Sequence, residues 1–142
     1  MPTFSKRSLK ELETCHPDLV RLCNEAIKYY DFSVNQGWRG KEEQEAAFKA
    51  GNTQLRYPNS KHNKTITVIE DGETKEIPCS LAIDVLPYPL DWHDTERFIY
   101  MHGIFEVCAQ QLGIKIRHGT DWNMNNRMKD EKFRDYPHIE LV

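Results

Sequence analysis

Apolar side chains recur every three or four residues in four stretches of the chain, which is the spacing of an α-helix. These stretches predict helices over residues 8–13, 17–30, 42–50 and 94–112. Gly51 and Gly113 follow the last two stretches, in the position where glycine commonly ends a helix. The longest predicted helix turns one apolar face toward a core, made of Phe98, Met101, Phe105, Cys108 and Leu112.

Alternation of apolar and polar residues predicts short strands over residues 32–35, 80–86, 114–116 and 137–141. Two more β-prone runs flank Asp71-Gly72, a turn sequence typical of a hairpin. We interpret this hairpin, at about residues 64–78, as an insertion, because candidate site residues lie on both sides of it. The order of elements predicts one α+β domain over residues 1–142, with a small, mostly antiparallel sheet and flanking helices.

Composition narrows the class of protein further. The chain has 142 residues, of which 39% are hydrophobic and 29% charged, and this balance does not suggest disorder or a membrane protein. A formal charge of −3 argues against a dedicated nucleic-acid binder. The N-terminal residues lack the apolar core of a signal peptide. We therefore expect the four cysteines, Cys15, Cys23, Cys79 and Cys108, to be reduced and mostly buried.

Candidate metal ligands occur in three separate segments. His62 lies in a polar loop, Asp84 lies on a strand whose opposite face is apolar, and His138 shares one strand face with Glu140. Two imidazoles and one carboxylate suit a catalytic Zn²⁺ ion with an open position for water. Asp135, on the turn that enters the last strand, would then be the general base.

Spacing alone leaves a chance coincidence open, because the chain has six histidines and 22 acidic residues. His93 and His102 show no partner pattern, and we interpret them as structural or surface residues.

Several ordered motifs resemble those of a known family. Ser60-x-His62, Ala82-x-Asp84 and Asp135-x-x-His138 resemble the pattern of the M15 metallopeptidases, which include D-Ala-D-Ala peptidases and phage L-alanyl-D-glutamate endopeptidases. From about residue 34 onward, four segments resemble the VanY-like and phage branch, namely Gln36-Gly37-Trp38-Arg39 with Gln44, residues 82–89, residues 113–122 and residues 133–140. The fold that this resemblance implies is that of Hedgehog and D-Ala-D-Ala peptidases.

The resemblance also implies roles for individual residues. It implies one Zn²⁺ ion per chain, bound by His62, Asp84 and His138. Asp135 matches the catalytic base, and Arg39 matches the arginine that stabilises the oxyanion or the substrate carbonyl. Around the ligands or in the substrate cleft it places Ser60, Asp121, Trp122 and Glu140.

Other interpretations of these side chains stay open. Arg39 could form a surface salt bridge, Trp122 could pack in the core, and Glu140 could be a charge on an edge strand. The hairpin lengthens the gap between His62 and Asp84. Its position next to a candidate ligand allows it to form one wall of the cleft, but the sequence does not assign it a role.

The function implied by the resemblance is a zinc-dependent peptidoglycan peptidase of the phage endolysin type, which hydrolyses the L-alanyl-D-glutamate bond of the stem peptide. Two alternatives remain, a D-Ala-D-Ala carboxypeptidase and a non-catalytic zinc-containing binding module. We expect a monomer that binds no nucleic acid and does not insert into a membrane. We also expect synthesis in the cytoplasm without a signal peptide, and action on the cell wall after release by another protein.

Overall fold

The central sheet has four antiparallel strands in the order β1-β4-β6-β5. In the computed structural model, which describes residues 2–142, these strands are β1 (Phe32–Gln36), β4 (Ala82–Pro87), β5 (Ile116–His118) and β6 (His138–Leu141). The two inner strands, β4 and β6, pair in the register that sets Ile83 opposite Ile139. Both of these side chains are fully buried, so the centre of the sheet belongs to the core.

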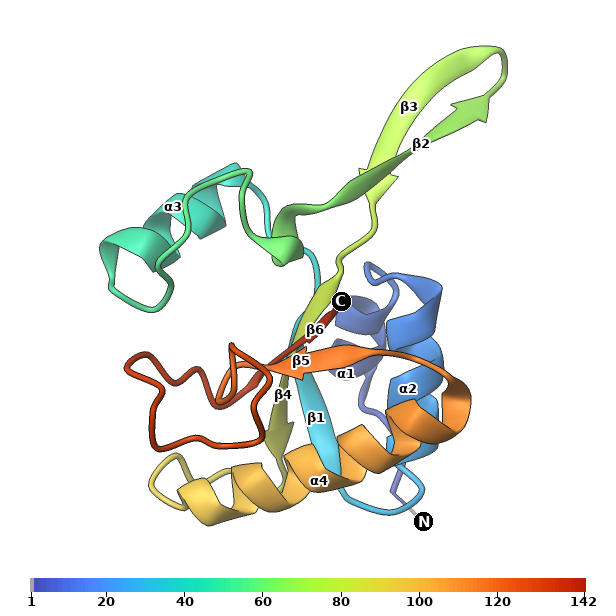
Figure 1. The fold of residues 1–142 in the computed structure, drawn as a ribbon. Helices are drawn as coiled ribbons and strands as arrows, with labels where there is room; N and C mark the ends of the chain where they lie inside the picture. The colour runs from blue at the N-terminus through green and yellow to red at the C-terminus, as the bar shows by residue number, and fades with distance from the viewer. Residues whose placement is uncertain (1) are drawn as a thin grey trace.

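Three helices, α1 (Lys6–Leu12), α2 (Pro17–Ala26) and α4 (Thr95–Leu112), pack against the sheet. In Figure 1, α1 and α2 stand beside the sheet, and α4 runs beneath it. The helices and the sheet bury a single apolar cluster between them. Its side chains that are at most 1% exposed include Leu19, Leu22, Val34, Ile83, Val85, Phe98, Met101, Phe105 and Ile139.

The second helix ends earlier than its sequence pattern predicts. It begins at Pro17, where the preceding His16 caps it through a hydrogen bond from the backbone N–H of Asp18 to Nδ1. It ends at Ala26 rather than at residue 30, because the backbone tightens there: the N–H of Lys28 donates to the carbonyl of Glu25, three residues back. The apolar spacing predicts which side chains face the core, but it does not detect this change.

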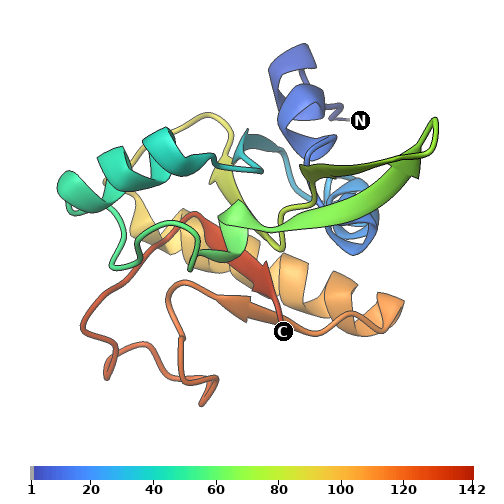
Figure 2. The ribbon, with the colours of Figure 1, turned by 90° about the horizontal axis from the view of Figure 1, so that it is seen from above.

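The remaining helix, α3 (Lys41–Lys49), lies on the side of the sheet opposite α4 (Figures 1 and 2). A 3₁₀ turn, η1 (Lys61–Asn63), follows it within the stretch predicted as a loop. Between β5 and β6 the chain forms a long irregular loop, as predicted. Both views show α3 and this loop on the same side of the molecule.

The predicted hairpin forms a separate two-stranded sheet, β2 (Thr65–Glu70) and β3 (Glu73–Pro78). Asp71 and Gly72 form its turn with φ angles of 53° and 79°, in the left-handed region that glycine adopts most easily. In both ribbon views the hairpin projects from the body on the side away from α3. At its base, the N–H of Cys79 donates to the carbonyl of Lys64 across 2.9 Å, which holds the two ends together.

These observations confirm the predicted α+β class and the small antiparallel sheet. All four cysteines are free and buried, as predicted. Among residues 2–142, no helix has the length and apolar character that crossing a membrane requires.

The first testable prediction concerns the core. Phe105→Ala should lower the free energy of unfolding by about 3–5 kcal/mol, because it leaves a cavity where a fully buried ring packed. Urea denaturation followed by circular dichroism measures this change. Ile69→Ala, at a hairpin side chain that is 79% exposed, should change the same quantity by less than about 0.5 kcal/mol. Equal losses in both variants would contradict the core described here.

Candidate metal centre

The pairing of β4 with β6 creates the centre of the site. Asp84 lies opposite His138 in this register, and η1 brings His62 beside the pair. His62 Nε2 lies 3.2 Å from Asp84 Oδ1 and 3.2 Å from His138 Nδ1. One nitrogen or oxygen atom from each of the three residues lies within 4.8 Å of the others. The structure thus brings together the three residues proposed from the sequence as metal ligands.

The His62 ring is held in one orientation. Ser60 caps η1 by accepting a hydrogen bond from the backbone N–H of His62, and its own N–H donates to Asn63 Oδ1. On the ring, Nδ1 lies 2.8 Å from the carbonyl oxygen of Gly37. Because a carbonyl oxygen can only accept, Nδ1 carries the proton, and Nε2 is free to bind a cation.

Gly37 has room for no side chain. A Cβ atom at this position would collide with the carbonyl of Glu11 and with Thr14 Oγ1. The backbone of Gly37 can therefore lie against the end of α1 while its carbonyl accepts from His62.

A buried carboxylate holds the second imidazole. His138 Nε2 lies 2.8 Å from Glu140 Oε1, and Arg117 donates two hydrogen bonds, of 2.6 and 3.0 Å, to Glu140 Oε2. Burial opposes ionisation of Glu140, but the hydrogen bonds with His138 and Arg117 outweigh it and lower the pKa of Glu140 to about 2. Such a carboxylate fixes the tautomer of a ligating histidine and leaves Nδ1 directed at the other ligands.

Arg39 lies beside the ligands and is hydrogen-bonded on three sides. It donates through Nη1 to Gln44 Oε1 across 3.0 Å and through Nε to Gln36 Oε1 across 3.2 Å. Its Nη2 lies 3.4 Å from Asp84 Oδ2. The side chain is only 11% exposed, so this is a partly buried, oriented cation rather than a surface salt bridge.

Asn63 belongs to the same network, and its role was not predicted from the sequence. Its Nδ2 donates to the carbonyl of Arg39 across 2.8 Å and to Gln44 Oε1 across 3.1 Å. The signal in the sequence is its position directly after His62, three residues beyond a capping serine.

Asp135 lies on the turn that enters β6. Its N–H donates to the carbonyl of Gly119, and the N–H of Gly119 donates to the carbonyl of His138, each across 2.8 Å. A Cβ atom at Gly119 would collide with the backbone of Asp135, so this approach requires glycine. Burial, together with the charge of Asp84, raises the pKa of Asp135 to about 6. A carboxylate with such a pKa can accept a proton near neutral pH.

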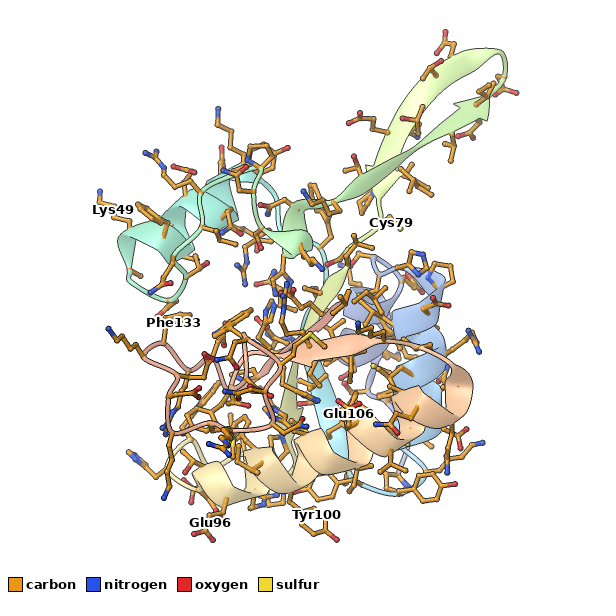
Figure 3. All side chains as sticks on the ribbon, viewed as in Figure 1. Lys49, Cys79, Glu96, Tyr100, Glu106 and Phe133 are labelled. Atoms are coloured by element: carbon orange, nitrogen blue, oxygen red, sulfur yellow. The ribbon has the colours of Figure 1, made fainter. Side chains whose placement is uncertain are left out.

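Two cavities meet at the three candidate ligands. One has a volume of about 760 Å³ and extends from α3 past Asp84 to Trp92. The other, of about 210 Å³, lies on the side of His62 and Trp122. Arg39, Phe133 and Asp135 line both of them. Figure 3 shows Phe133 on the long loop, on the side that faces α3.

The hairpin is not a wall of this cleft, a possibility that its place beside His62 in the sequence had left open. No residue of the range 64–78 lines either cavity. The strands leave η1 in the direction away from α3, so closeness in sequence does not bring them to the cleft.

Two neighbouring residues of the long loop differ in their placement. Trp122 lines the smaller cavity, where its ring centroid lies 5.2 Å from that of His138, and its Nε1 donates to the carbonyl of Phe133. The expectation that Asp121 also lies at the cleft is not met. Its carboxylate accepts from the backbone N–H groups of Asn125 and Asn126, and it faces a separate cavity. Adjacent side chains in this turn point to different sides.

His102 supports the segment that carries Asp135. It is buried, its Nε2 lies 2.7 Å from the carbonyl oxygen of Tyr136, and its Nδ1 lies 3.2 Å from Thr120 Oγ1. Its ring stacks on His118 with centroids 4.8 Å apart. Burial and the nearby His118 lower the pKa of His102 to about 3, so the ring is neutral at physiological pH. Of the two histidines interpreted as structural or surface residues, His102 is therefore structural and His93 is exposed.

We predict that His102→Ala lowers the free energy of unfolding by about 2–4 kcal/mol, because it leaves a cavity and removes the partners of a buried carbonyl and a hydroxyl. His93→Ala is the matched control and should change it by less than about 0.5 kcal/mol. Chemical denaturation at pH 7 measures both values. Equal stability of the His102 variant and the parent chain would show that these contacts contribute nothing.

Comparisons with known proteins identify the family of this chain. The sequence profile of the family described as phage L-alanyl-D-glutamate peptidase matches residues 2–142. The L-alanyl-D-glutamate peptidase of Escherichia phage T5 is 36% identical over 147 residues, which cover 98% of this chain and 97% of that protein.

A solved structure is also similar. The crystal structure of the Serratia marcescens L-Ala D-Glu endopeptidase ChiX superposes with a TM-score of 0.71 and 25% sequence identity, and covers 99% of this chain and 90% of that one. With a family profile that spans the described residues and a full-length relative above 30% identity, the chain belongs to the phage L-alanyl-D-glutamate peptidase family.

Proposed function

We propose that the chain is a zinc-dependent endopeptidase that hydrolyses the L-alanyl-D-glutamate bond in the stem peptide of peptidoglycan. The observation that carries this proposal is the convergence of His62, Asp84 and His138 at two cavities that Asp135 also lines, in a chain of this peptidase family. The two similar proteins bear the same activity in their names.

The donor set fits zinc. Two imidazole nitrogens and one carboxylate oxygen are ligands that Zn²⁺ takes in catalytic sites, where a fourth position stays open. Both histidines have their other ring nitrogen occupied, His62 by the carbonyl of Gly37 and His138 by Glu140, so each ring offers one defined donor. When bound, a zinc ion would polarise the scissile carbonyl and lower the pKa of a water molecule to about 7.

Asp135 and Arg39 line both cavities and supply the other two catalytic groups. Asp135 is the carboxylate positioned to take a proton from the attacking water and to pass it to the leaving amine. Its raised pKa reflects burial among carboxylates, and the positive charge of a dication would lower that pKa. Arg39, oriented by Gln36 and Gln44, presents its charge toward the carbonyl oxygen as negative charge develops there.

The shape of the cleft favours an endopeptidase over a D-Ala-D-Ala carboxypeptidase. A carboxypeptidase needs a closed end with a cation for the terminal carboxylate, whereas here the cavities of about 760 and 210 Å³ continue on either side of the ligands. A purely structural zinc site would need a fourth protein ligand. Among the described residues, the group that converges on the centre contains three.

We further propose that the enzyme acts as a monomer on the cell wall. The stem peptide is then its partner, and another protein releases it from the cytoplasm where it is made. Lysis would depend on that release, because the substrate lies beyond the membrane.

The decisive experiment measures the loss of turbidity of permeabilised Gram-negative cells, with chelator and after zinc is added back. Mass spectrometry of the products should show new D-glutamate amino termini. A folded, zinc-loaded protein that releases none, or that releases free D-alanine instead, would refute the proposed bond.

We predict that His138→Ala binds less than the single zinc ion per chain expected of the parent, because one of three ligands is lost. Zinc content after dialysis, measured by atomic emission spectroscopy, checks this. An unchanged zinc content would rule out the proposed centre.

We predict that Asp135→Asn keeps zinc and stability but lowers kcat by at least about 100-fold, because the amide cannot accept the proton. The same zinc assay and a peptide-hydrolysis assay test the two halves of this statement. Loss of zinc from this variant would mean that Asp135 is a ligand and not the base.

A further inference from the structure

One large aromatic side chain at the cleft has no part in the proposed chemistry. Trp92 belongs to the segment of the chain that joins β4 to α4, and 52% of its surface is exposed. It lines the 760 Å³ cavity together with Asp84, Asp135 and Arg39. An exposed tryptophan in the same cavity as the reacting groups is placed to touch whatever the cavity binds.

The indole of Trp92 packs against a buried aromatic side chain. It stacks on Phe98, with ring centroids 5.6 Å apart and the ring planes at 22°. Phe98 is 1% exposed and packs edge-to-face on Tyr136, which directly follows Asp135 in the chain. The indole of Trp92 therefore has a fixed position relative to the segment that carries Asp135.

The two cavities differ in what they can hold. The volume of about 760 Å³ lies within the range of about 300–1,000 Å³ of ligand pockets, whereas about 210 Å³ lies below it. The larger cavity is also lined by Asn35, Gln36, Asn52 and Arg134, whose amides and guanidinium can hydrogen-bond to hydroxyl and acetamido groups.

Peptidoglycan offers one ring next to the scissile bond. The L-alanine of its stem peptide is joined through a lactyl group to a muramic acid sugar. The C–H groups on one face of a pyranose carry partial positive charge, and the face of an indole is negative, so the two stack.

We propose that Trp92 is a platform for the muramyl sugar, and that the larger cavity binds the glycan side of the scissile bond. This inference rests on the proposed function. It makes the glycan-linked stem peptide the preferred substrate, rather than the free peptide. If Trp92 merely covered Phe98, its removal would affect both substrates equally.

Kinetics on two matched substrates test the proposal. One is N-acetylmuramyl-L-alanyl-γ-D-glutamyl-diaminopimelate, and the other carries an acetyl group in place of the muramyl part. We expect Trp92→Ala to lower kcat/KM for the muramyl substrate about five- to tenfold and to leave the acetyl-peptide within about twofold. Trp92→Phe should recover part of the loss. Tyr100→Ala removes another exposed aromatic ring, on the outer face of α4 (Figure 3), and should change neither value.

A binding measurement separates this inference from the proposed function. N-acetylmuramyl-L-alanine, the product on the glycan side, should shift the indole N–H signal of Trp92 in a two-dimensional proton–nitrogen NMR spectrum, whereas N-acetyl-L-alanine should not. The chain has three tryptophans, so loss of one signal in Trp92→Ala assigns it. A wild-type enzyme that cleaves neither substrate would refute the endopeptidase alone. An absent shift, or equal loss on both substrates, would overturn the sugar platform.

Discussion

The site depends on the pairing of β4 with β6, because this pairing sets Asp84 opposite His138. The same register buries Ile83 and Ile139 on the core side of the two strands. A shift of one residue would bring Ile139 to the ligands and turn His138 into the apolar core, at the cost of burying its polar ring there. The hydrophobic core and two of the candidate metal ligands are therefore held by one set of backbone hydrogen bonds.

The buried side chains of His62, His138 and Glu140 are tolerated because their polar groups have partners. His62 donates to a backbone carbonyl, and Glu140 joins His138 to Arg117. Burial alone would raise the pKa of Asp84, but the interactions of its carboxylate with the neighbouring His62 and His138 rings lower it well below its ordinary value. A buried, ionised carboxylate between two imidazoles is a suitable environment for a divalent cation.

The sheet and the irregular loop each contribute different residues to the site. The candidate ligands His138 and Asp84 lie on inner strands, whereas Asp135 and Trp122 lie on the loop between β5 and β6. That loop is tied down at Gly119 by backbone hydrogen bonds and at Tyr136 by His102. Supports of this kind restrict the position of the Asp135 carboxylate, as the proposed role in proton transfer requires.

Local pattern in the sequence was sufficient for the α+β class, the helices near residues 42–50 and 94–112 and the hairpin, because periodicity and turn residues are carried by neighbouring residues. The candidate ligands His62, Asp84 and His138 lie far apart in the sequence, and only the resemblance of several ordered motifs to a known family singled them out. The motifs also placed Trp122 at the cleft. Only the tertiary structure decided that Asp121 faces elsewhere, that the hairpin leaves the cleft open and that His102 is a buried support. These features depend on contacts between segments that are distant in the sequence. One example is the contact of His102 with Tyr136, 34 positions further along the chain. Local periodicity carries no information about such contacts.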